Sequence, residues 1–147
     1  GYNYRMSNIC AGIGRGQMEV LDAHVQLRRE MHDFYVDLFQ DIDAVRVFTF
    51  LNTDYFANYW LSAILIEPNK AKRMDREALR LAFEAASIES RPLWKPMHLQ
   101  PIFEQYPYYG SNVAETLFEK GLCLPSGSNL TDEERVRIKR VVLDFFE

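Results

Sequence analysis

A helical pattern extends from Ser7 to Gln40 and determines what the N-terminal part of the chain can form. Ser7 is a residue type that favours helix N-termini, because its hydroxyl accepts a hydrogen bond from a free backbone N–H group. Large apolar side chains recur four, three and four residues apart, at Leu27, Met31, Phe34 and Leu38. This spacing places them on one stripe of a helix. The pattern predicts a long helix, straight or bent, that packs through this stripe against another element.

Three glycines, Gly12, Gly14 and Gly16, interrupt the first third of this helix. Each weakens a helix by about 1 kcal/mol relative to alanine, so we expect a compensating close approach by another backbone. The string GIGRG also resembles part of a dinucleotide-binding fingerprint. That fingerprint needs a preceding strand and GxGxxG spacing, and because neither is present the sequence argues against a dinucleotide site.

The middle of the chain alternates strand and helix patterns. Residues 45–50 (VRVFTF) alternate apolar and polar side chains, and residues 60–66 (WLSAILI) form a nearly continuous apolar run, as a well-covered strand would. Asp75 is expected to cap an amphipathic helix that ends near Ala86. Residues 87–94 (SIESRPLW) predict a strand that leads into a loop punctuated by prolines.

Two capping boxes are expected in the C-terminal third. Asn112 and Glu115 have the spacing of the first, ahead of a helix that Gly121 would end. Residues 122–125 (LCLP) predict a short strand followed by a turn. Thr131 and Glu134 form the second box and open a last helix. Its expected inner face consists of Ile138, Val141, Val142 and Phe145.

Helix, strands, helix, strand, helix, strand and helix follow one another without an internal repeat. This order predicts one α/β (α+β) domain, in which helices cover a small sheet of short strands and a long N-terminal helix forms an arm. We expect residues 1–40 to be a linking segment with the long helix, and residues 41–147 to be the small domain.

Composition and charge narrow the functional classes. The chain has 147 residues, of which 48% are apolar, enough for a packed core. A net charge of −4 argues against nucleic acid or an anionic membrane as a partner, because polyanions are bound by basic surfaces. No apolar run approaches the roughly 20 residues that span a bilayer. Cys10 and Cys123 lie far apart without a CxxC motif, so we expect a cytoplasmic protein without structural disulfides or zinc.

The densest group of candidate binding residues is RPLWKPMH, residues 91–98. Arg91 can form bidentate contacts with phosphate or carboxylate, and Lys95 can act as a point charge. Trp94 offers a flat face for stacking, and His98 can donate or accept a hydrogen bond. Two prolines restrict the segment and reduce the entropy lost when a ligand orders it. The alternative is that both cations are solvated and that His98 only caps a turn.

A second group, GYNYR, opens the chain. The Asn3 amide and the Arg5 guanidinium suit a phosphate, and Tyr2 and Tyr4 could stack or form hydrogen bonds. The alternative is a frayed terminus. No metal site is expected, because His24 and His32 lie two helical turns apart and no other group has zinc-ligand spacing.

Three segments in order resemble one enzyme family: GYNYRMSNICAGIGRGQMEVLD, IESRPLWKPMHLQPIF and VAETLFEKGLCLPSGSNLTDEE. The chain resembles the C-terminal small domain of the fold-type I, pyridoxal-phosphate-dependent nucleotide-sugar aminotransferases over its whole length. Its RPLWKPMH and GLCLPSG segments are similar to those of enzymes that aminate C4 of a UDP-linked 4-keto-6-deoxy-N-acetylhexosamine, as in bacillosamine synthesis. The resemblance implies a larger N-terminal domain, absent from this chain, that carries the Schiff-base lysine, so no catalytic residue is assigned here.

The resemblance also implies roles for individual residues. Asn3 matches a position that reaches the cofactor phosphate of the other subunit of a homodimer, and Arg5 matches a cation near that phosphate or the substrate. His98, with Trp94 and Lys95, matches the segment that meets the nucleotide-sugar. Tyr4 and Arg91 are further substrate-binding candidates.

The implied reaction transfers an amino group, usually from glutamate in this family, to a nucleotide-linked keto sugar. It serves the synthesis of surface polysaccharide or another glycan. This chain alone is expected to be inert. Two alternatives stay open: a related sugar dehydratase, in which a histidine replaces the lysine, and a non-catalytic module whose aromatic surface binds a protein.

Overall fold

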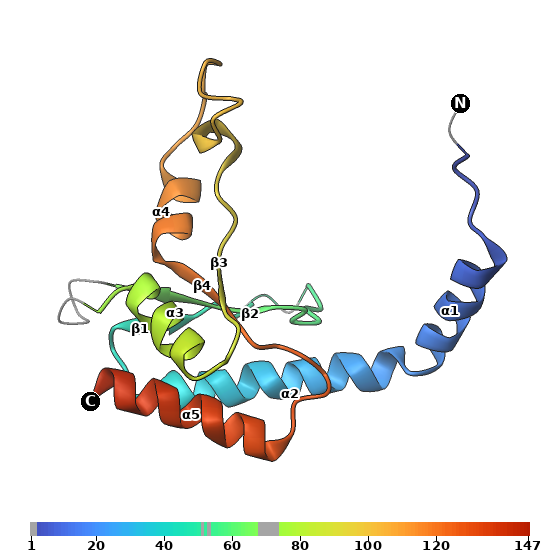
Figure 1. Cartoon of the computed structure of the whole chain (residues 1–147), viewed down its shortest axis with the longest axis horizontal. Helices are drawn as coiled ribbons and strands as arrows, with labels where there is room; N and C mark the ends of the chain where they lie inside the picture. The colour runs from blue at the N-terminus through green and yellow to red at the C-terminus, as the bar shows by residue number, and fades with distance from the viewer. Residues whose placement is uncertain (1–2, 51, 53, 68–73) are drawn as a thin grey trace.

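The structure is a computed structural model that describes residues 3–50, 52, 54–67 and 74–147 (Figure 1). Tyr2 of the GYNYR group lies outside these described residues. The helices are α1 (Asn8–Glu19), α2 (Leu21–Phe39), α3 (Arg76–Ala85), the short 3₁₀ helix η1 (Met97–Leu99), α4 (Val113–Lys120) and α5 (Asp132–Phe146). The strands are β1 (Val45–Val47), β2 (Ser62–Ile66), β3 (Arg91–Pro92) and β4 (Gly121–Leu124).

The four strands form one antiparallel sheet in the order β1-β2-β4-β3. In β2, Ser62 pairs with Leu124 of β4, and across β4 Cys123 pairs with Arg91 of β3. The predicted class, a small sheet with covering helices, is confirmed. The strands are shorter than the sequence patterns, since β1 covers residues 45–47 of the 45–50 pattern and β3 covers residues 91–92 of the 87–94 pattern.

The hydrophobic core lies between the sheet and helices α2, α3 and α5. Residues 62–66 alternate between buried and half-buried, so only one face of β2 is fully enclosed, not both faces as the apolar run suggested. The fully buried side chains that meet there include Met31 and Tyr35 of α2, Ile64 and Ile66 of β2, Leu79 and Phe83 of α3, and Ile138 and Val142 of α5. The expected inner face of α5 therefore lies in the core. The α2 stripe was predicted only in part: Met31 is fully buried, Phe34 and Leu38 lie at the edge of the core, and the buried Tyr35 and Phe39 lie outside the predicted stripe.

The predicted long helix is broken. Val20 has φ −115° and ψ 4°, outside the helical region, and separates α1 from α2. The break therefore lies after the three glycines and not at them. Ser7 caps α1 as expected, with its hydroxyl accepting from the Cys10 N–H group at 3.2 Å. Figure 1 shows α1 turned away from α2 at the end of the molecule that carries the N-terminus.

The expected close approach to the α1 glycines does not occur within the described part of the chain. A Cβ atom added at Gly12, Gly14 or Gly16 would meet no other atom of the described chain within 4 Å. None of the residues of α1 is buried. The N-terminal helix thus contributes nothing to the core, and its surface is open.

Helix α2 also holds the ends of two loops together. The Arg28 guanidinium donates to the carbonyl oxygens of Trp60, at 2.8 Å, and Ser126, at 2.9 Å. The buried Ser126 hydroxyl accepts from the Ser62 N–H group and donates to the Leu124 carbonyl, both at 2.8 Å. These bonds tie the predicted turn after β4 to the start of β2.

Candidate functional site

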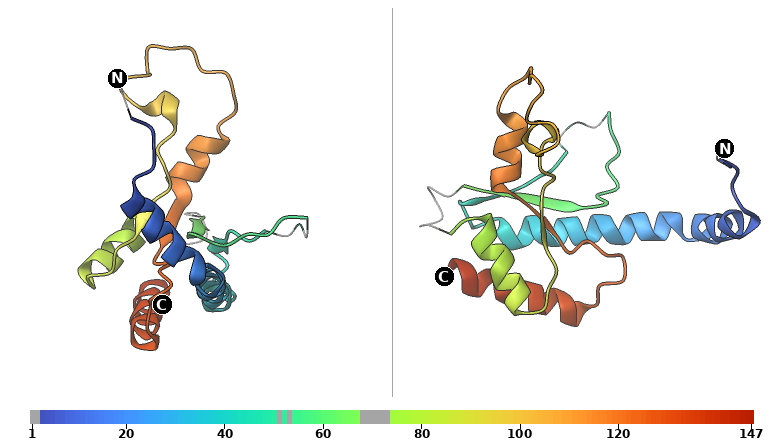
Figure 2. Two further views of the ribbon diagram at one scale, coloured as in Figure 1. Left: turned by 90° about the vertical axis from the view of Figure 1, so that its right-hand side faces the viewer. Right: turned by 45° about the horizontal axis from the view of Figure 1, so that its top comes forward.

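The segment from β3 to α4 forms an arm that stands away from the sheet. It leaves the sheet at β3, passes through η1 and returns along α4 to β4, and both figures of the whole chain show it projecting on the side opposite α5 (Figures 1 and 2). The RPLWKPMH group lies on the outgoing half of this arm. The predicted loop is therefore an ordered element with a helix alongside it.

His98 is the most constrained side chain of the arm. Its Nε2 atom lies 2.9 Å from Oε1 of Glu115, in the first turn of α4. Its ring stacks on that of Tyr108, with ring centroids 3.7 Å apart and planes inclined by 18°. The His98 side chain is 16% exposed, so it is mostly covered but not fully buried. These contacts fix both the position and the plane of the imidazole.

The same contact overturns one sequence expectation. Asn112 is the N-cap residue of α4, but its side chain makes no capping bond, so the predicted Asn112–Glu115 capping box does not form. The Glu115 carboxylate is instead engaged with His98, which lies 17 positions earlier in the chain. A tertiary contact has replaced the local one.

Trp94 and Lys95 are exposed on the arm. The Trp94 side chain is 69% exposed, which leaves its ring free to stack against a flat ligand. Lys95 is also exposed, and its carbonyl oxygen accepts from the Gln100 amide at 3.4 Å. Both side chains are accessible, as a binding role requires.

Arg91 lies at the base of the arm and is paired within the chain. Its Nε atom donates to Oε1 of Glu89 at 2.7 Å, and the two side chains form an exposed ion pair. Arg91 and Trp94 line a cavity of about 900 Å³ between β3, β4 and the first half of α5, together with Trp60, Cys123 and Ser126. Lys95 and His98 are not part of its lining, so the structure separates the RPLWKPMH group into two places.

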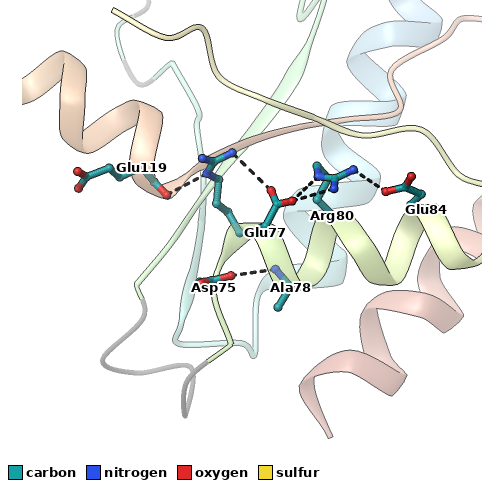
Figure 3. A network of polar contacts seen from close by, with 7 residues as sticks. Asp75, Glu77, Ala78, Arg80, Glu84 and Glu119 are labelled. Atoms are coloured by element: carbon teal, nitrogen blue, oxygen red, sulfur yellow. Dashed lines mark hydrogen bonds and ion pairs between the residues drawn. The ribbon is translucent and has the colours of Figure 1, made fainter. Parts of the chain in front are cut away.

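The return half of the arm is anchored to α3, as the close view shows (Figure 3). Asp75 caps α3 by accepting from the Ala78 N–H group at 2.8 Å, which confirms the predicted cap. Arg76 then donates from Nε to the Glu119 carbonyl at 3.0 Å. Its guanidinium also lies over the Phe118 ring, 5.0 Å from the centroid. The C-terminal turn of α4 is thereby held against the body of the molecule.

An ion-pair ladder along α3 lies next to this anchor. Arg80 forms ion pairs with Glu77, at 2.8 Å, and Glu84, at 2.7 Å. The hydrogen bond from Arg80 is the main reason that the pKa of Glu77 lies below its usual value. Both carboxylates are exposed, so these ion pairs contribute little to stability.

Asn3, Tyr4 and Arg5 precede α1 and are exposed. The Asn3 Oδ1 atom accepts from the Arg5 backbone N–H group at 3.0 Å, which forms a local Asx turn. This segment and the arm rise on the same side of the molecule, near opposite ends of α2 (Figures 1 and 2). The structure therefore does not bring the two predicted groups of binding residues together within one chain.

The described residues suit the phosphate of a cofactor but not its covalent attachment. Asn3 and Arg5 offer an amide and a guanidinium, both good phosphate donors. Among the described lysines, Lys95 and Lys139 are exposed and Lys120 is paired with Glu67 at 2.7 Å. A Schiff-base lysine needs a desolvated amine, and none of these three has that environment.

No metal centre is found within the described parts of the chain, since no three His, Cys, Asp or Glu side chains are grouped for one. His32 is buried and stacks on Tyr59, with ring centroids 3.6 Å apart. Within those same parts, no helix has the length and apolar character needed to cross a membrane.

Sequence reasoning did not single out Tyr108 or the tertiary role of Glu115. Tyr108 lies in a tyrosine- and proline-rich loop whose pattern predicts no regular structure, and Glu115 had a local explanation. The available signal was the position of both residues between RPLWKPMH and β4, since a chain that leaves a sheet and returns to it must bring its two halves together.

A family model described as the DegT/DnrJ/EryC1/StrS aminotransferase family matches residues 1–143. A relative from Bacillus subtilis, named putative pyridoxal phosphate-dependent aminotransferase EpsN, is 42% identical over 153 residues, covering 99% of this chain and 37% of the relative. The GDP-perosamine synthase of Escherichia coli O157:H7 is 34% identical, covering 99% of this chain and 38% of that enzyme. The chain thus spans somewhat more than a third of the length of these relatives.

Solved structures share the fold. The aminotransferase PseC of Helicobacter pylori, involved in the biosynthesis of pseudoaminic acid, has a TM-score of 0.84 at 22% identity, covering 99% of this chain and 39% of that chain. The GDP-4-keto-6-deoxy-D-mannose-3-dehydratase of E. coli, with bound hydrated PLP, has a TM-score of 0.78 at 22% identity, covering 96% of this chain and 36% of that chain. At these identities the likeness concerns the fold alone.

The match to the family model extends from the N-terminal GYNYR group through the arm to α5. It includes all the elements that position the candidate residues. This chain therefore belongs to the DegT/DnrJ/EryC1/StrS aminotransferase family, a family of pyridoxal-phosphate-dependent enzymes.

Proposed function

We propose that this chain is part of an enzyme that transfers an amino group, with glutamate as donor, to a nucleotide-linked keto sugar. The observation that carries the proposal is the 42% identity to an aminotransferase over 99% of the chain. The substrate class is supported by relatives named GDP-perosamine synthases. The proposal includes a homodimer in the cytoplasm that serves the synthesis of a surface polysaccharide or another glycan.

Within this proposal the sugar is a UDP-linked 4-keto-6-deoxy-N-acetylhexosamine, and C4 receives the amine. The RPLWKPMH and GLCLPSG segments support this choice through their resemblance to enzymes of that type. The GDP-perosamine synthases are the reason to test a GDP-linked sugar beside it.

Each candidate residue has a physical role in the proposed complex. Trp94 stacks on a flat part of the ligand, and Lys95 offsets the charge of the diphosphate. His98 binds the sugar moiety, Arg91 lies at the margin of the same ligand, and Tyr4 reaches it from the other subunit of the proposed dimer.

Asn3 and Arg5 bind the cofactor phosphate in the other subunit of the dimer. Their exposure supports this role, because it leaves the amide and the guanidinium accessible to a group outside the chain. When bound, pyridoxal phosphate supplies the electron sink of the reaction. We expect the 147-residue chain alone not to transfer the amine, since no described lysine is desolvated.

A dehydratase is the second candidate, because one of the structures with the same fold is a sugar 3-dehydratase. The two activities would differ at the residue that replaces or provides the Schiff-base lysine. Any coding sequence upstream of Gly1 would decide the matter: a lysine at that position supports the aminotransferase, and a histidine supports the dehydratase.

The nucleotide-sugar can be tested on the chain itself by tryptophan fluorescence. The chain has two tryptophans, so Trp60→Phe leaves Trp94 as the only reporter. We expect saturable quenching by UDP-N-acetylglucosamine and weaker quenching by GDP-mannose. Lys95→Ala should weaken binding about tenfold, since hydrogen bonds to charged groups contribute about 1.5–3 kcal/mol. Lys139→Ala, an exposed lysine on α5, is the matched control.

Tighter binding of GDP-mannose would contradict the UDP assignment and favour a perosamine-type substrate. Quenching by neither nucleotide-sugar would contradict the role of Trp94 in binding.

A further inference from the structure

Glu115 is placed to control which nitrogen of His98 meets a ligand. We propose that Glu115 is a positioning residue: its carboxylate holds Nε2 of His98, so that Nδ1 is the atom offered to the sugar. The identity of the ligand rests on the proposed function, but the contact between the two residues does not. The proposal adds Glu115 to the site and assigns His98 the role of an acceptor.

The direction of the hydrogen bond follows from the chemistry of the two groups. An ionised carboxylate has no hydrogen to donate, so the hydrogen between His98 and Glu115 must belong to the ring. The Nε2–Oε1 separation of 2.9 Å is typical of an N–H group bound to a carboxylate. A hydrogen bond at one ring nitrogen determines the state of the other. In the neutral ring Nδ1 therefore carries a lone pair.

Nδ1 is available for a ligand, because it makes no hydrogen bond to any residue in the described part of the chain. A lone pair accepts from a donor such as a sugar hydroxyl or an acetamido N–H group. It does not suit a phosphate oxygen, which is also an acceptor. The neutral His98 ring would therefore recognise the sugar, and the phosphates would be left to Lys95.

The ring plane is fixed by a second contact. Tyr108 stacks on His98 and is itself held by its hydroxyl, which donates to the Ser111 carbonyl at 2.8 Å. Gly110 makes room for this arrangement, since an added Cβ at that position would overlap the Tyr108 ring and hydroxyl. The imidazole is thus clamped on one face and at one nitrogen.

Glu115 is carried by a helix whose far end is fixed. Arg76 holds the Glu119 carbonyl and the Phe118 ring, and Lys120 pairs with Glu67 at 2.7 Å. A carboxylate in a first helical turn also interacts favourably with the helix dipole, so Glu115 stabilises α4 as well. The test must therefore read the state of the His98 ring and not only stability.

Long-range ¹H–¹⁵N spectra of the chain labelled in its histidines report that state directly. The chain has three histidines, and His98→Asn identifies the signals of His98. Near neutral pH we expect the hydrogen of the neutral ring on Nε2. Glu115→Ala should lower the ratio of the two tautomers at least about tenfold, since a hydrogen bond to a charged group contributes about 1.5–3 kcal/mol. Glu119→Gln, one turn further along α4, should leave the ratio unchanged.

A His98 ring with its hydrogen on Nδ1, or a ratio that Glu115→Ala does not change, would overturn the proposal. Titration with UDP-N-acetylglucosamine then tests the ligand separately. A shift of the Nδ1 signal supports both inferences. A fixed tautomer without such a shift would leave Glu115 as the partner that sets the His98 tautomer, and would contradict the sugar-binding role proposed for His98.

Discussion

Gly121 is required because it has no side chain, and not because of its backbone conformation. The sequence predicted that it ends the helix before it, and it is the C-cap of α4. Its φ of −92° is accessible to any residue, so no left-handed turn is involved. An added Cβ would instead overlap the Leu93 side chain and the Leu117 carbonyl oxygen. Gly121 therefore allows the outgoing and returning halves of the arm to meet at the sheet.

We expect Gly121→Ala to lower the free energy of unfolding by about 1–3 kcal/mol, because backbone and Leu93 must shift to admit the methyl group. Urea denaturation followed by circular dichroism measures the change. Gly14→Ala is the control, since its Cβ would meet nothing and alanine favours a helix. Equal stability of the Gly121 variant and the original chain would show that the arm adjusts without cost.

Tyr35 is a polar residue at the centre of the core. Its hydroxyl donates to the Pro125 carbonyl at 2.8 Å, and burial raises the pKa of the phenol far above its usual value. Because the folded-state pKa is raised, its contribution to stability is complete below the ordinary tyrosine pKa and decreases as the pH rises above it.

In an alkaline ultraviolet titration, we expect Tyr35 to ionise only when the chain unfolds. Tyr35→Phe should remove that late step and lower stability by about 1 kcal/mol, because the Pro125 carbonyl loses its partner. A late step that persists in the variant would assign it to another tyrosine.

At the scale of elements, two similar capping patterns had different outcomes. Thr131 and Glu134 form a full capping box at the start of α5, as predicted. Asn112 and Glu115 do not: the Asn112 side chain makes no capping bond, and the Glu115 carboxylate contacts His98. A local pattern is decisive only where no distant residue competes for the same group.

The two patterns make a matched pair of substitutions. Thr131→Ala should cost about 1 kcal/mol, the usual contribution of a helix cap. Asn112→Ala should change the free energy of unfolding by only a few tenths of the loss expected for Thr131→Ala, since the Asn112 side chain makes no capping bond. Thermal unfolding of both variants measures the difference, and an equal loss in the two would contradict the assignment of the caps.

The α5 cap also predicts a pH dependence. Hydrogen bonds from the Thr131 backbone and hydroxyl hold the pKa of Glu134 below its usual value. Because the folded-state pKa is lowered, the contribution is present above the ordinary glutamate pKa and is lost as the pH falls through the lowered value. Carboxyl NMR titration should show the Glu134 pKa rising part of the way in Thr131→Ala, since the backbone donor remains. An unchanged pKa would exclude the hydroxyl as a cause.

The sequence was informative wherever a pattern is local. The inner face of α5, the Asp75 and Thr131 caps and the approximate positions of the strands follow from spacing alone. The buried side of α2 follows only in part, since Tyr35 and Phe39 lie outside the predicted stripe. The break at Val20 did not, because no residue type there disfavours a helix strongly. Neither did the group formed by His98, Tyr108 and Glu115, since it depends on how the arm folds back.

At the scale of the molecule, the N-terminal helix differs from the core helices in how much of it is buried. Helices α2, α3 and α5 enclose the core with the sheet, whereas α1 has no buried residue. Ile9 and Ile13 of α1 are 77% and 62% exposed. Most of the stability of a protein helix comes from packing, so α1 should be much less stable than α2.

Amide hydrogen exchange tests this difference in stability between α1 and α2. We expect amides of α1 to exchange quickly and those of residues 31–39 in α2 to be protected nearly to the limit of global unfolding, because the latter are in the core. Equal protection of both helices in the monomeric chain would contradict it.

The two cysteines also differ in burial. Cys10 is exposed on α1, while Cys123 is buried in β4, where burial raises the pKa of its thiol. Thiolates are the reactive species, so a maleimide dye should attach at Cys10 alone without any change to the sequence. Cys10 is thereby an attachment site for a fluorescent dye in the unmodified sequence, and such a dye can report movement of the N-terminal helix relative to the rest of the molecule in solution.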